Sequence, residues 1–285
     1  MKKIPVRNIH STKESTSGRF NIRRVQDILG GRDLQHDLHR HNFFFILAVQ
    51  TGQGHHEIDF TPHPVVDKSL FFLRPGQVHQ LQLTAGSVGY LMEFDTAFYR
   101  PANKAAVQRL RKASNKHFCL LEAGNFEKLN TILSGIFAEF TGKLDGFEEV
   151  IKASLEIFFI EYVRQSSGPA GTAAPSGAYM QERFEEFIEL METHIASHKQ
   201  VSAYTEFMNL SSYQLNEVTK TAVGKTASAL IDEYILLETK RYLLATANQV
   251  KEVADQLGYD DVSYFIRFFK KHTGYSPEAF RKNFK

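Results

Sequence analysis

Apolar and polar positions alternate along the first 100 residues, and glycine or proline interrupts the alternation. HNFFFILAVQTGQGHHEIDF, residues 41–60, is an apolar run, a glycine-containing turn and an alternating segment. SLFFLRPGQVHQLQL, residues 69–83, repeats this plan around a Pro-Gly turn, and SVGYLMEF, residues 87–94, adds another alternating segment. Short strands separated by turn residues predict an all-β sandwich or barrel.

The hydrophobic period becomes helical after about residue 125. The apolar positions recur at three- and four-residue intervals: Leu129, Ile132, Leu133, Ile136, Phe137 and Phe140. Residues 150–163 predict a second helix that is apolar over most of its circumference, so it needs several covering surfaces. Two hypotheses stay open for it: it packs on the β domain, or it forms a subunit interface.

A stretch of small residues, glycine and proline divides the chain. SSGPAGTAAPSGA, residues 166–178, offers nothing to a hydrophobic core and is typical of a flexible linker. Only helical patterns follow it. The sequence therefore predicts an α+β protein of two domains, with a β-rich and helical part over 1–165, a linker over 166–180 and an all-α domain over 181–285.

Composition and charge exclude several classes of protein. No apolar run approaches 18 residues, so no membrane span is expected, and the lysines near the N-terminus are not followed by the apolar segment of a secretory signal. The single cysteine, Cys119, excludes a disulfide within the chain, favours a cytoplasmic location and is expected to be structural. Net charge is only +2, but the stretch from residue 240 to the end carries nine basic and five acidic residues.

Two segments of the C-terminal part resemble each other. FMNLSSYQLNEVTKTAVGKT, residues 207–226, is similar to QLGYDDVSYFIRFFKKHTGYS, residues 256–276, with one extra residue in the second turn. In the second copy an apolar face around Val253 and Ala254 predicts a short helix that Gly258 can end. Asp260 or Asp261 can then cap the next helix. Two weakly similar copies of one supersecondary motif are the simplest interpretation.

The helix predicted after that turn has two chemically different faces. Its back is aromatic: Phe265, Phe268, Phe269 and His272. Its front is polar and basic: Ser263, Tyr264, Arg267, Lys270 and Lys271. A short helix, a tight turn and a second helix with a basic front form the helix-turn-helix pattern, whose second helix enters the major groove of DNA. Arginine can pair there with guanine, and lysine can meet phosphate.

The first copy predicts a similar but less basic helix. Leu215, Val218 and Thr219 form its back. The candidate DNA contacts on and beside its front are Ser212, Tyr213, Gln214, Asn216, Glu217 and Lys220. Glutamate can accept from cytosine, and asparagine can pair with adenine or a phosphate.

These C-terminal motifs resemble the signature of AraC/XylS-type transcription regulators. The matching positions are Val253-Ala254, Leu257-Gly258-Tyr259, Ser263-Tyr264-Phe265, Arg267, Phe269-Lys270, Gly274, Ser276-Pro277 and Phe280-Arg281. The resemblance implies two helix-turn-helix units joined by a long helix, here 227–244, that enter successive major grooves. The first unit departs from the family pattern at Thr205 and Asn209, although asparagine also tolerates the left-handed turn expected at 209. The long joining helix departs from it at Leu236.

The N-terminal part resembles the cupin-like sensor domain of the same family. HRHNFFFILAVQTGQG and LRPGQVHQL stand where that domain carries a histidine-containing strand and a Pro-Gly-x-x-His turn. Three imidazoles, those of His39, His41 and His79, suit zinc or a similar ion, yet Phe44, Phe45 and Ile46 stand where metal-binding cupins carry a glutamate. We therefore expect no metal and no cofactor. The candidate effector-binding residues are His39, His41, Phe43, Phe45, His79 and Tyr90, while His55 and His56 are expected on an exposed hairpin.

Three functions remain as hypotheses. The first is a cytoplasmic transcriptional activator, a homodimer, that binds double-stranded operator DNA, a small-molecule effector and, by resemblance to the family, RNA polymerase. The second is a metal-dependent cupin enzyme fused to a DNA-binding domain. The third is a regulator controlled by its abundance, in which the β domain only dimerises. The chain shows no constellation of catalytic nucleophiles and no phosphate-binding glycine loop.

Overall fold

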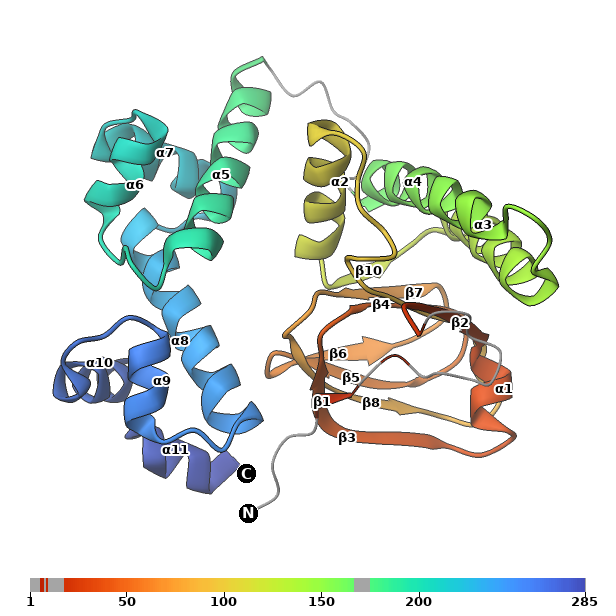
Figure 1. Ribbon diagram of the computed structural model, residues 1–285, viewed down its shortest axis with the longest axis horizontal. Helices are drawn as coiled ribbons and strands as arrows, with labels where there is room; N and C mark the ends of the chain where they lie inside the picture. Colours follow the sequence, from red (N-terminus) through yellow and green to blue (C-terminus); the bar gives the residue numbers. More distant parts are fainter. Residues whose placement is uncertain (1–5, 8, 10–17, 167–174, 285) are drawn as a thin grey trace. The chain divides into compact units, whose positions relative to one another are not determined.

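The computed structural model describes residues 6, 7, 9, 18–166 and 175–284, and the chain divides into two compact units at residues 169 and 170 (Figure 1). The predicted linker falls largely on residues 167–174, which lie outside the described part. Residues 175–180, also assigned to that linker, belong to the helix α5, Pro175–His194. Among the described helices, none is long and apolar enough to cross a membrane.

The N-terminal unit contains two five-stranded sheets. Its strands are β1 (Val6–Arg7), β2 (Phe20–Arg24), β3 (Leu34–His41), β4 (Phe44–Thr51), β5 (Gly54–Ile58), β6 (Thr61–Val65), β7 (Ser69–Leu73), β8 (Val78–Leu83), β9 (Val88–Phe94) and β10 (Phe118–Leu120). One sheet has the order β1-β3-β8-β5-β6 and the other the order β10-β7-β4-β9-β2. The short helix α1 (Val25–Leu29) follows β2. The predicted β-rich N-terminal part is confirmed.

The apolar run of β4 is buried on both of its faces. Phe45, Leu47 and Val49 belong to a core between the two sheets, whereas Phe44 and Ile46 belong to a core on the other side of β4. Successive side chains of a strand point to opposite faces, so a strand covered on both sides reads as a continuous apolar stretch rather than an alternating one.

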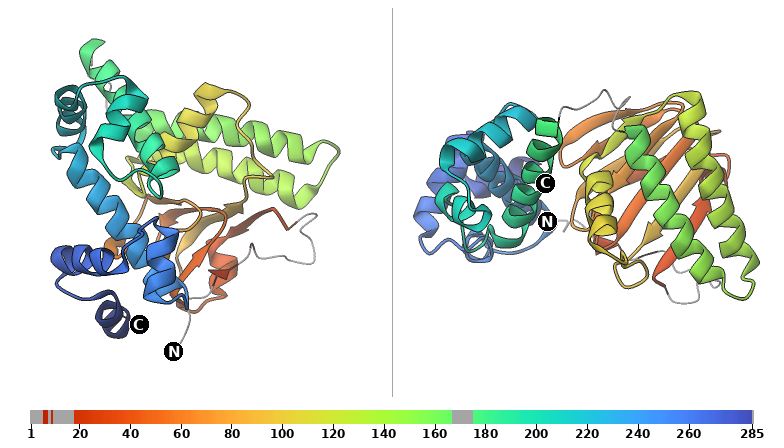
Figure 2. Two further views of the ribbon diagram at one scale, coloured as in Figure 1. Left: turned by 60° about the vertical axis from the view of Figure 1, so that its left-hand side comes forward. Right: turned by 90° about the horizontal axis from the view of Figure 1, so that it is seen from above.

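Three helices follow the strands: α2 (Lys104–Asn115), α3 (Ala123–Gly142) and α4 (Phe147–Ser166). Figure 2 shows α3 and α4 lying side by side over a sheet. The aromatic ring of Phe159 on α4 stacks on Phe72 of β7 at 5.5 Å between centroids. Of the two hypotheses for α4, packing on the β domain is therefore observed. Val150 and Ile157, exposed by 44% and 53%, remain outside that contact.

The C-terminal unit is entirely helical where it is described. After α5 come α6 (Val201–Met208), α7 (Ser212–Val223), α8 (Ala227–Ala245), α9 (Val250–Gln256), α10 (Val262–Thr273) and α11 (Pro277–Phe284). The pairs α6–α7 and α9–α10 are the two predicted helix-turn-helix units, and α8 joins them. The all-α prediction for this part of the chain is confirmed.

The turns of both units use left-handed residues, as expected. Asn209 ends α6 with φ 51° and ψ 48°, and Gly258 lies between α9 and α10 with φ 68°. Ser211 caps α7 in a capping box, and the side chain of Asp261 caps α10 by accepting from the backbone N–H of Ser263 at 2.7 Å. Gly224 and Gly274 end the two second helices in the left-handed conformation.

Candidate nucleic-acid interface and interior polar cluster

The helix α10 has an aromatic back and an exposed basic front. Phe265 and Phe269 are fully buried, and Phe269 meets Phe280 of α11 edge to face. The predicted contact residues on the opposite side are all exposed: Ser263, Tyr264, Arg267, Lys270 and Lys271. We call these five residues the front of α10.

Arg267 is the most central cation of this front. Its side chain is 69% exposed, and one guanidinium nitrogen lies 3.7 Å from a carboxylate oxygen of Asp261. A solvent-exposed pair of this length adds little to stability. The guanidinium therefore remains available for a planar, bidentate partner such as the edge of a guanine.

The helix α7 presents a less basic surface. Tyr213 is 74% exposed, and Ser212, Glu217 and Lys220 are exposed as well. Leu215, Val218 and Thr219 are buried, as predicted for the back of this helix. One acid and one base on the front of α7, against three bases on the front of α10, make α10 the stronger candidate for phosphate contacts.

Two of the residues predicted to contact DNA also make hydrogen bonds within the fold. The side-chain oxygen of Gln214 accepts from the backbone N–H of Ser211 at 2.9 Å, which completes the capping box of α7. The side-chain oxygen of Asn216, a half-buried residue, accepts from the backbone N–H of Ala227 at 3.0 Å and so ties α7 to the start of α8. Both bonds use the side-chain oxygen, so a pair with adenine that needs oxygen and nitrogen together would compete with them.

Four histidines gather between the two sheets of the N-terminal unit. His39, His41, His56 and His79 are at most 3% exposed. The ring of His79 is central: its centroid lies 4.2 Å from that of His39, 4.9 Å from that of His41 and 5.1 Å from that of His56. Phe43 stacks on His41 at 4.2 Å, and Phe45 lies 5.1 Å from His79.

Hydrogen bonds fix the orientation of these rings. Nδ1 of His39 donates to the carbonyl oxygen of Asp37 at 2.8 Å, and Nδ1 of His41 donates to that of Phe43 at 2.9 Å. Nε2 of His56 and Nδ1 of His79 share a hydrogen bond of 2.8 Å. In their neutral form, His39 and His41 thus keep Nε2 as an acceptor.

Burial keeps the four imidazoles neutral. It lowers the pKa of His39 to about 3 and that of His41 to about 4, although the hydrogen bonds to backbone carbonyls oppose both shifts. Burial also lowers the pKa of His56 and of His79 well below the usual value, and the neighbouring histidines add to that effect.

Polar side chains of β2 and β9 extend this cluster. The side-chain amide of Asn21 donates to a carboxylate oxygen of Glu93 at 3.2 Å, and Arg23 lies 3.7 Å from the same oxygen. The charge of Glu93 also acts on His41. We call the resulting set the polar end of the barrel: Asn21, Arg23, His39, His41, His56, His79 and Glu93.

Several buried atoms of the polar end have no hydrogen-bond partner among the described residues. They are Oδ1 of Asn21, Nε of Arg23, Nε2 of His41, Nδ1 of His56 and Nε2 of His79. A buried polar atom without a partner costs about 1–3 kcal/mol. Their concentration in one place is a chemical feature of a site for a polar ligand.

The described residues do not form a metal site. Although four imidazoles lie close together, no group of three or more His, Cys, Asp or Glu side chains in the described part of the chain has an arrangement that could hold a metal ion. The tight pairing of His56 with His79 uses ring nitrogens of two of these residues.

Each of these two regions lies in a part of the chain that matches a known protein family. Residues 204–283 match the family "Helix-turn-helix domain", and residues 29–111 match the family "AraC-like ligand binding domain". The chain belongs to the AraC family of transcriptional regulators.

Relatives of this AraC-family chain include regulators that it matches over most of their length. It is 22% identical to the transcriptional activator RhaS of Salmonella arizonae, over 86% of this chain and 87% of that protein. It is 20% identical to the uncharacterized regulator YfiF of Bacillus subtilis, over 87% and 79%. The arabinose operon regulatory protein of Salmonella typhimurium is 28% identical over 36% of this chain and 37% of that protein. Among solved structures, ToxT of Vibrio cholerae is 14% identical, covers 92% of this chain and gives a TM-score of 0.44.

His56 corrects one expectation for this AraC-family chain. The sequence suggested that His55 and His56 both lie on an exposed hairpin, but only His55 is exposed. His56 is fully buried because β5 places it on the same face as Ile58, which belongs to the core between the sheets. The alternation of side chains along Gly54–Ile58 could have predicted that His56 and Ile58 share a buried face.

Tyr90 does not join the other predicted effector residues. The alternation of β9 directs Leu91 into the core between the sheets and Tyr90 to the other face, where its ring meets Phe137 of α3 at 5.8 Å. There Tyr90 lines a separate, mainly polar cavity of about 230 Å³ together with Gln26 and Asn130. His39, His41, Phe43, Phe45 and His79 do lie together.

Proposed function

We propose that this chain is a cytoplasmic transcriptional activator that binds double-stranded DNA through α7 and α10 and responds to a small molecule bound at the polar end of the barrel. The DNA-binding residues are Ser212, Tyr213, Glu217 and Lys220 of α7 and Ser263, Tyr264, Arg267, Lys270 and Lys271 of α10. Gln214 and Asn216 support α7. Activation of transcription makes RNA polymerase a further partner.

The exposed front of α10 is the observation that carries the DNA-binding proposal. Three cations stand on one side of α10, the second helix of a helix-turn-helix, and Phe265 and Phe269 on its other side are buried. Such a helix can enter the major groove without exposing its core. The named relatives RhaS and YfiF are transcriptional regulators, which favours this function over a metal-dependent enzyme.

The polar end of the barrel supports the effector proposal. Its unpartnered atoms offer both donors and acceptors inside an apolar shell, and a ligand that pairs with them removes a cost that the free protein bears. His39, His41 and His79 with Phe43 and Phe45 would form its walls, and His56 with Asn21 and Glu93 would extend it. A regulator controlled only by abundance would have no need of such a site.

A homodimer is the proposed assembly, formed through α3 and α4. Val150 and Ile157 lie seven residues apart on α4, on one side of the helix, and are 44% and 53% exposed. Light scattering of the full-length protein should give twice the mass of the 32.5 kDa chain. Ile157→Glu should halve that value, whereas a monomeric wild type would remove this part of the proposal.

The DNA-binding proposal is tested with the full-length protein. A random pool of duplexes is selected against it, and the enriched sequence is titrated beside a scrambled duplex at several salt concentrations. We expect a sequence preference of at least about 10³ and a steep fall of affinity with salt. Absence of any enriched sequence would contradict the proposed function.

The effector proposal has its own experiment. A thermal-shift screen of small polar metabolites should find compounds that raise the melting temperature of the wild type. Replacement of His41 by Phe keeps the stacking shape beside Phe43 but removes the acceptor, so it should abolish the shift. Replacement of the exposed His55 by Phe is the matched control and should preserve it.

A further inference from the structure

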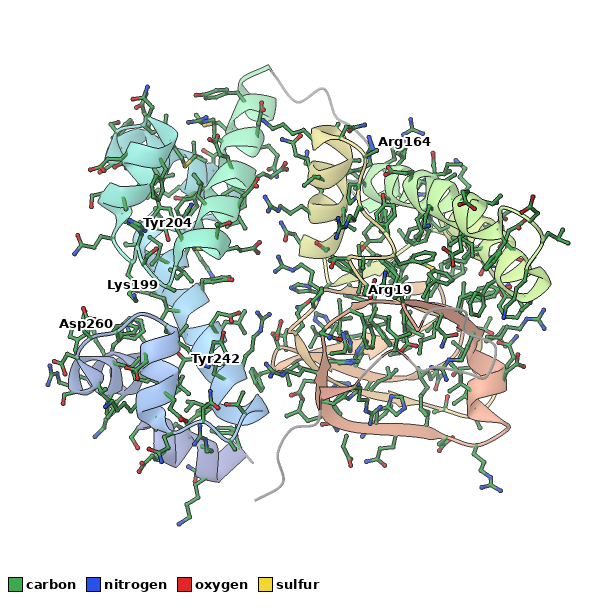
Figure 3. All side chains as sticks on the ribbon, viewed as in Figure 1. Arg19, Arg164, Lys199, Tyr204, Tyr242 and Asp260 are labelled. Atoms are coloured by element: carbon green, nitrogen blue, oxygen red, sulfur yellow. The ribbon has the colours of Figure 1, made fainter. Side chains whose placement is uncertain are left out.

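The loop that leads into the first helix-turn-helix unit contacts the turn of the second. Lys199, labelled in Figure 3, lies in the loop between α5 and α6. Its Nζ donates to the carbonyl oxygen of Ala196 at 2.9 Å and to that of Gly258 at 2.7 Å. The same ammonium lies 4.8 Å from the centroid of the Tyr259 ring. One side chain thus holds two carbonyls and an aromatic face from both units.

Gly258 is required at this contact by the close approach of the two backbones. An ideal Cβ on residue 258 would lie 1.6 Å from the carbonyl oxygen of Ala196. The left-handed conformation alone does not demand glycine, because Asn209 adopts it with φ 51° at the corresponding turn of the first unit. Residue 258 must therefore lack a side chain for the loop between α5 and α6 to make this contact.

The contact is anchored at both ends. On the first unit, the buried Tyr204 of α6 donates from its hydroxyl to the carbonyl oxygen of His198 at 2.6 Å, next to Lys199. On the second unit, the ring of Tyr259 lies 5.2 Å from Phe265 and 6.2 Å from Phe268, both on the back of α10. The contact thus extends from the core of the first unit to the second recognition helix.

Burial against the turn lowers the pKa of Lys199, while the carboxylate of Asp260 opposes that shift. The lysine is consequently more than a solvated surface charge. Its stem and ammonium are part of the packing between the units.

We propose that Lys199, seated against Gly258 and Tyr259, is a positioning residue that fixes the second helix-turn-helix relative to the first and so sets the spacing between the sites read by α7 and α10. This inference rests on the proposed DNA binding. The helix α8 packs against α6 and α7 and also against α9 and α11, so it already joins the units. A second attachment away from α8 restricts bending and rotation about that helix.

Rigid spacing has a measurable consequence for DNA binding. Two units that bind adjacent grooves act as a bivalent ligand, whose affinity depends on how well the fixed geometry matches the two half-sites. A rigid protein should bind the correct spacing tightly and a wrong spacing poorly. A flexible one should bind the correct spacing less tightly and tolerate the wrong one.

The test compares duplexes that differ only in spacing. The full-length wild type first selects its preferred duplex from a random pool, and a second duplex then carries one inserted base pair between the two half-sites. That insertion moves one half-site by about 3.4 Å and turns it by about 35°. We expect the wild type to lose at least about tenfold in affinity on insertion, and Lys199→Met to lose less than about threefold. On the original duplex, Lys199→Met should bind about tenfold more weakly than the wild type.

Two further variants separate this role from simpler ones. Lys199→Arg retains a cation over Tyr259 and should restore most of the discrimination between spacings. Lys282→Met removes an exposed lysine of α11 and should leave that discrimination unchanged. Lys199→Met could instead lose affinity equally on both duplexes and on a single half-site, with a smaller salt slope of binding. That result would make Lys199 a phosphate contact and overturn the proposal. Unchanged discrimination would overturn it as well, whereas failure to select any duplex would instead reject the proposed function.

Discussion

The polar end of the barrel and the front of α10 both gather polar side chains, but in opposite surroundings. The four histidines of the polar end are at most 3% exposed, and three of them carry a ring nitrogen without a partner in the described part of the chain. On the front of α10, the side chain of Arg267 is 69% exposed. The first arrangement needs partners for its buried polar atoms, and the second leaves stability nearly unaffected.

This difference separates the energetics expected of the two proposed binding sites. A buried unpartnered polar atom costs about 1–3 kcal/mol, so a ligand that supplies the missing partners stabilises the fold as it binds. An exposed cation is solvated, so it lowers the stability of the fold very little. When it contacts DNA phosphates, the release of counterions makes binding more favourable. Substitutions should therefore change stability at the polar end and change binding alone at the front of α10.

Acidification should produce the largest contrast between the two units. The folded histidines stay neutral because burial lowers the pKa of His39 to about 3 and of His41 to about 4, and lowers those of His56 and His79 further below their usual range. The unfolded chain takes up protons below about pH 6.5. Stability is thus complete at neutral pH and is lost as the pH falls through 6.5 toward the folded values. From pH 7.5 to 5.5 a ring that stays neutral in the folded state lowers the free energy of unfolding by roughly 1 kcal/mol.

Hydrogen exchange of the full-length protein, corrected for the intrinsic rate at each pH, measures this contrast. Strands β3, β5 and β8 should lose protection on acidification, while α9 and α10 should retain it. The adjacent residues His55 and His56 give a matched pair. His56→Phe should reduce the pH dependence more than His55→Phe, the exposed control. A pH dependence that is equal in both units would contradict the assignment of neutral buried histidines.

Arg267→Ala should have the next largest effect, on binding and not on folding. Loss of a bidentate guanine contact costs about 1–3 kcal/mol on the selected duplex and relaxes the preference at one base pair. Stability should change by less than about 0.5 kcal/mol, because the side chain is mostly exposed. Arg267→Lys is the matched control: it keeps the charge but loses the planar fork. It should bind scrambled DNA like the wild type and lose most of the specific affinity.

An equal loss for Arg267→Ala on selected and scrambled duplexes would make Arg267 a backbone contact. The base-reading role would then pass to another residue of the front of α10. Titrations at three salt concentrations distinguish the two outcomes.

Lys270→Gln and Lys271→Gln should have smaller effects that do not depend on sequence. Both side chains are exposed on the last turn of α10. Each substitution should lower the salt slope of binding by about one unit on selected and scrambled duplexes alike. Lys128→Gln, which removes an exposed lysine from α3, should leave the slope unchanged. An effect confined to the selected duplex would show that the lysine contacts a base.

Local periodicity made the fold largely predictable. The strands, the long helices and both helix-turn-helix units follow from apolar spacing and turn residues, since α10 carries its aromatic back and basic front in twelve consecutive residues. The exposure of that front could be predicted for the same reason. Which side of α10 is exposed depends on the spacing of apolar residues within that helix and not on residues distant in the sequence.

The polar end could be predicted only in part, because it is assembled from distant strands. His39, His41 and His79 stand near recognisable turns, but Asn21 and Glu93 meet across 72 residues, and neither lies in a motif. His56 and Tyr90 were misplaced because turn residues do not reveal which face of a strand a side chain occupies. Lys199 lies in a loop without periodicity, so only the contact with Gly258 distinguishes it.

Glu217→Ala should change the affinity for DNA least. Unlike the lysine substitutions, it should not weaken binding to scrambled DNA. Glu217 is exposed on α7, one turn before the exposed Lys220. A carboxylate near phosphates is repelled, so any favourable contact of Glu217 with DNA must be to a base, and the amino group of cytosine is the donor that suits it. Removal of the charge should leave affinity for the scrambled duplex unchanged or raise it slightly, while the selected duplex should lose about 1 kcal/mol or less and the preference at one base pair should relax. Glu217→Gln keeps an acceptor without the charge, so it should retain more of that preference than Glu217→Ala does. If both variants tighten binding to both duplexes equally, Glu217 only repels the backbone, and α10 alone carries the sequence preference that the two units were expected to share.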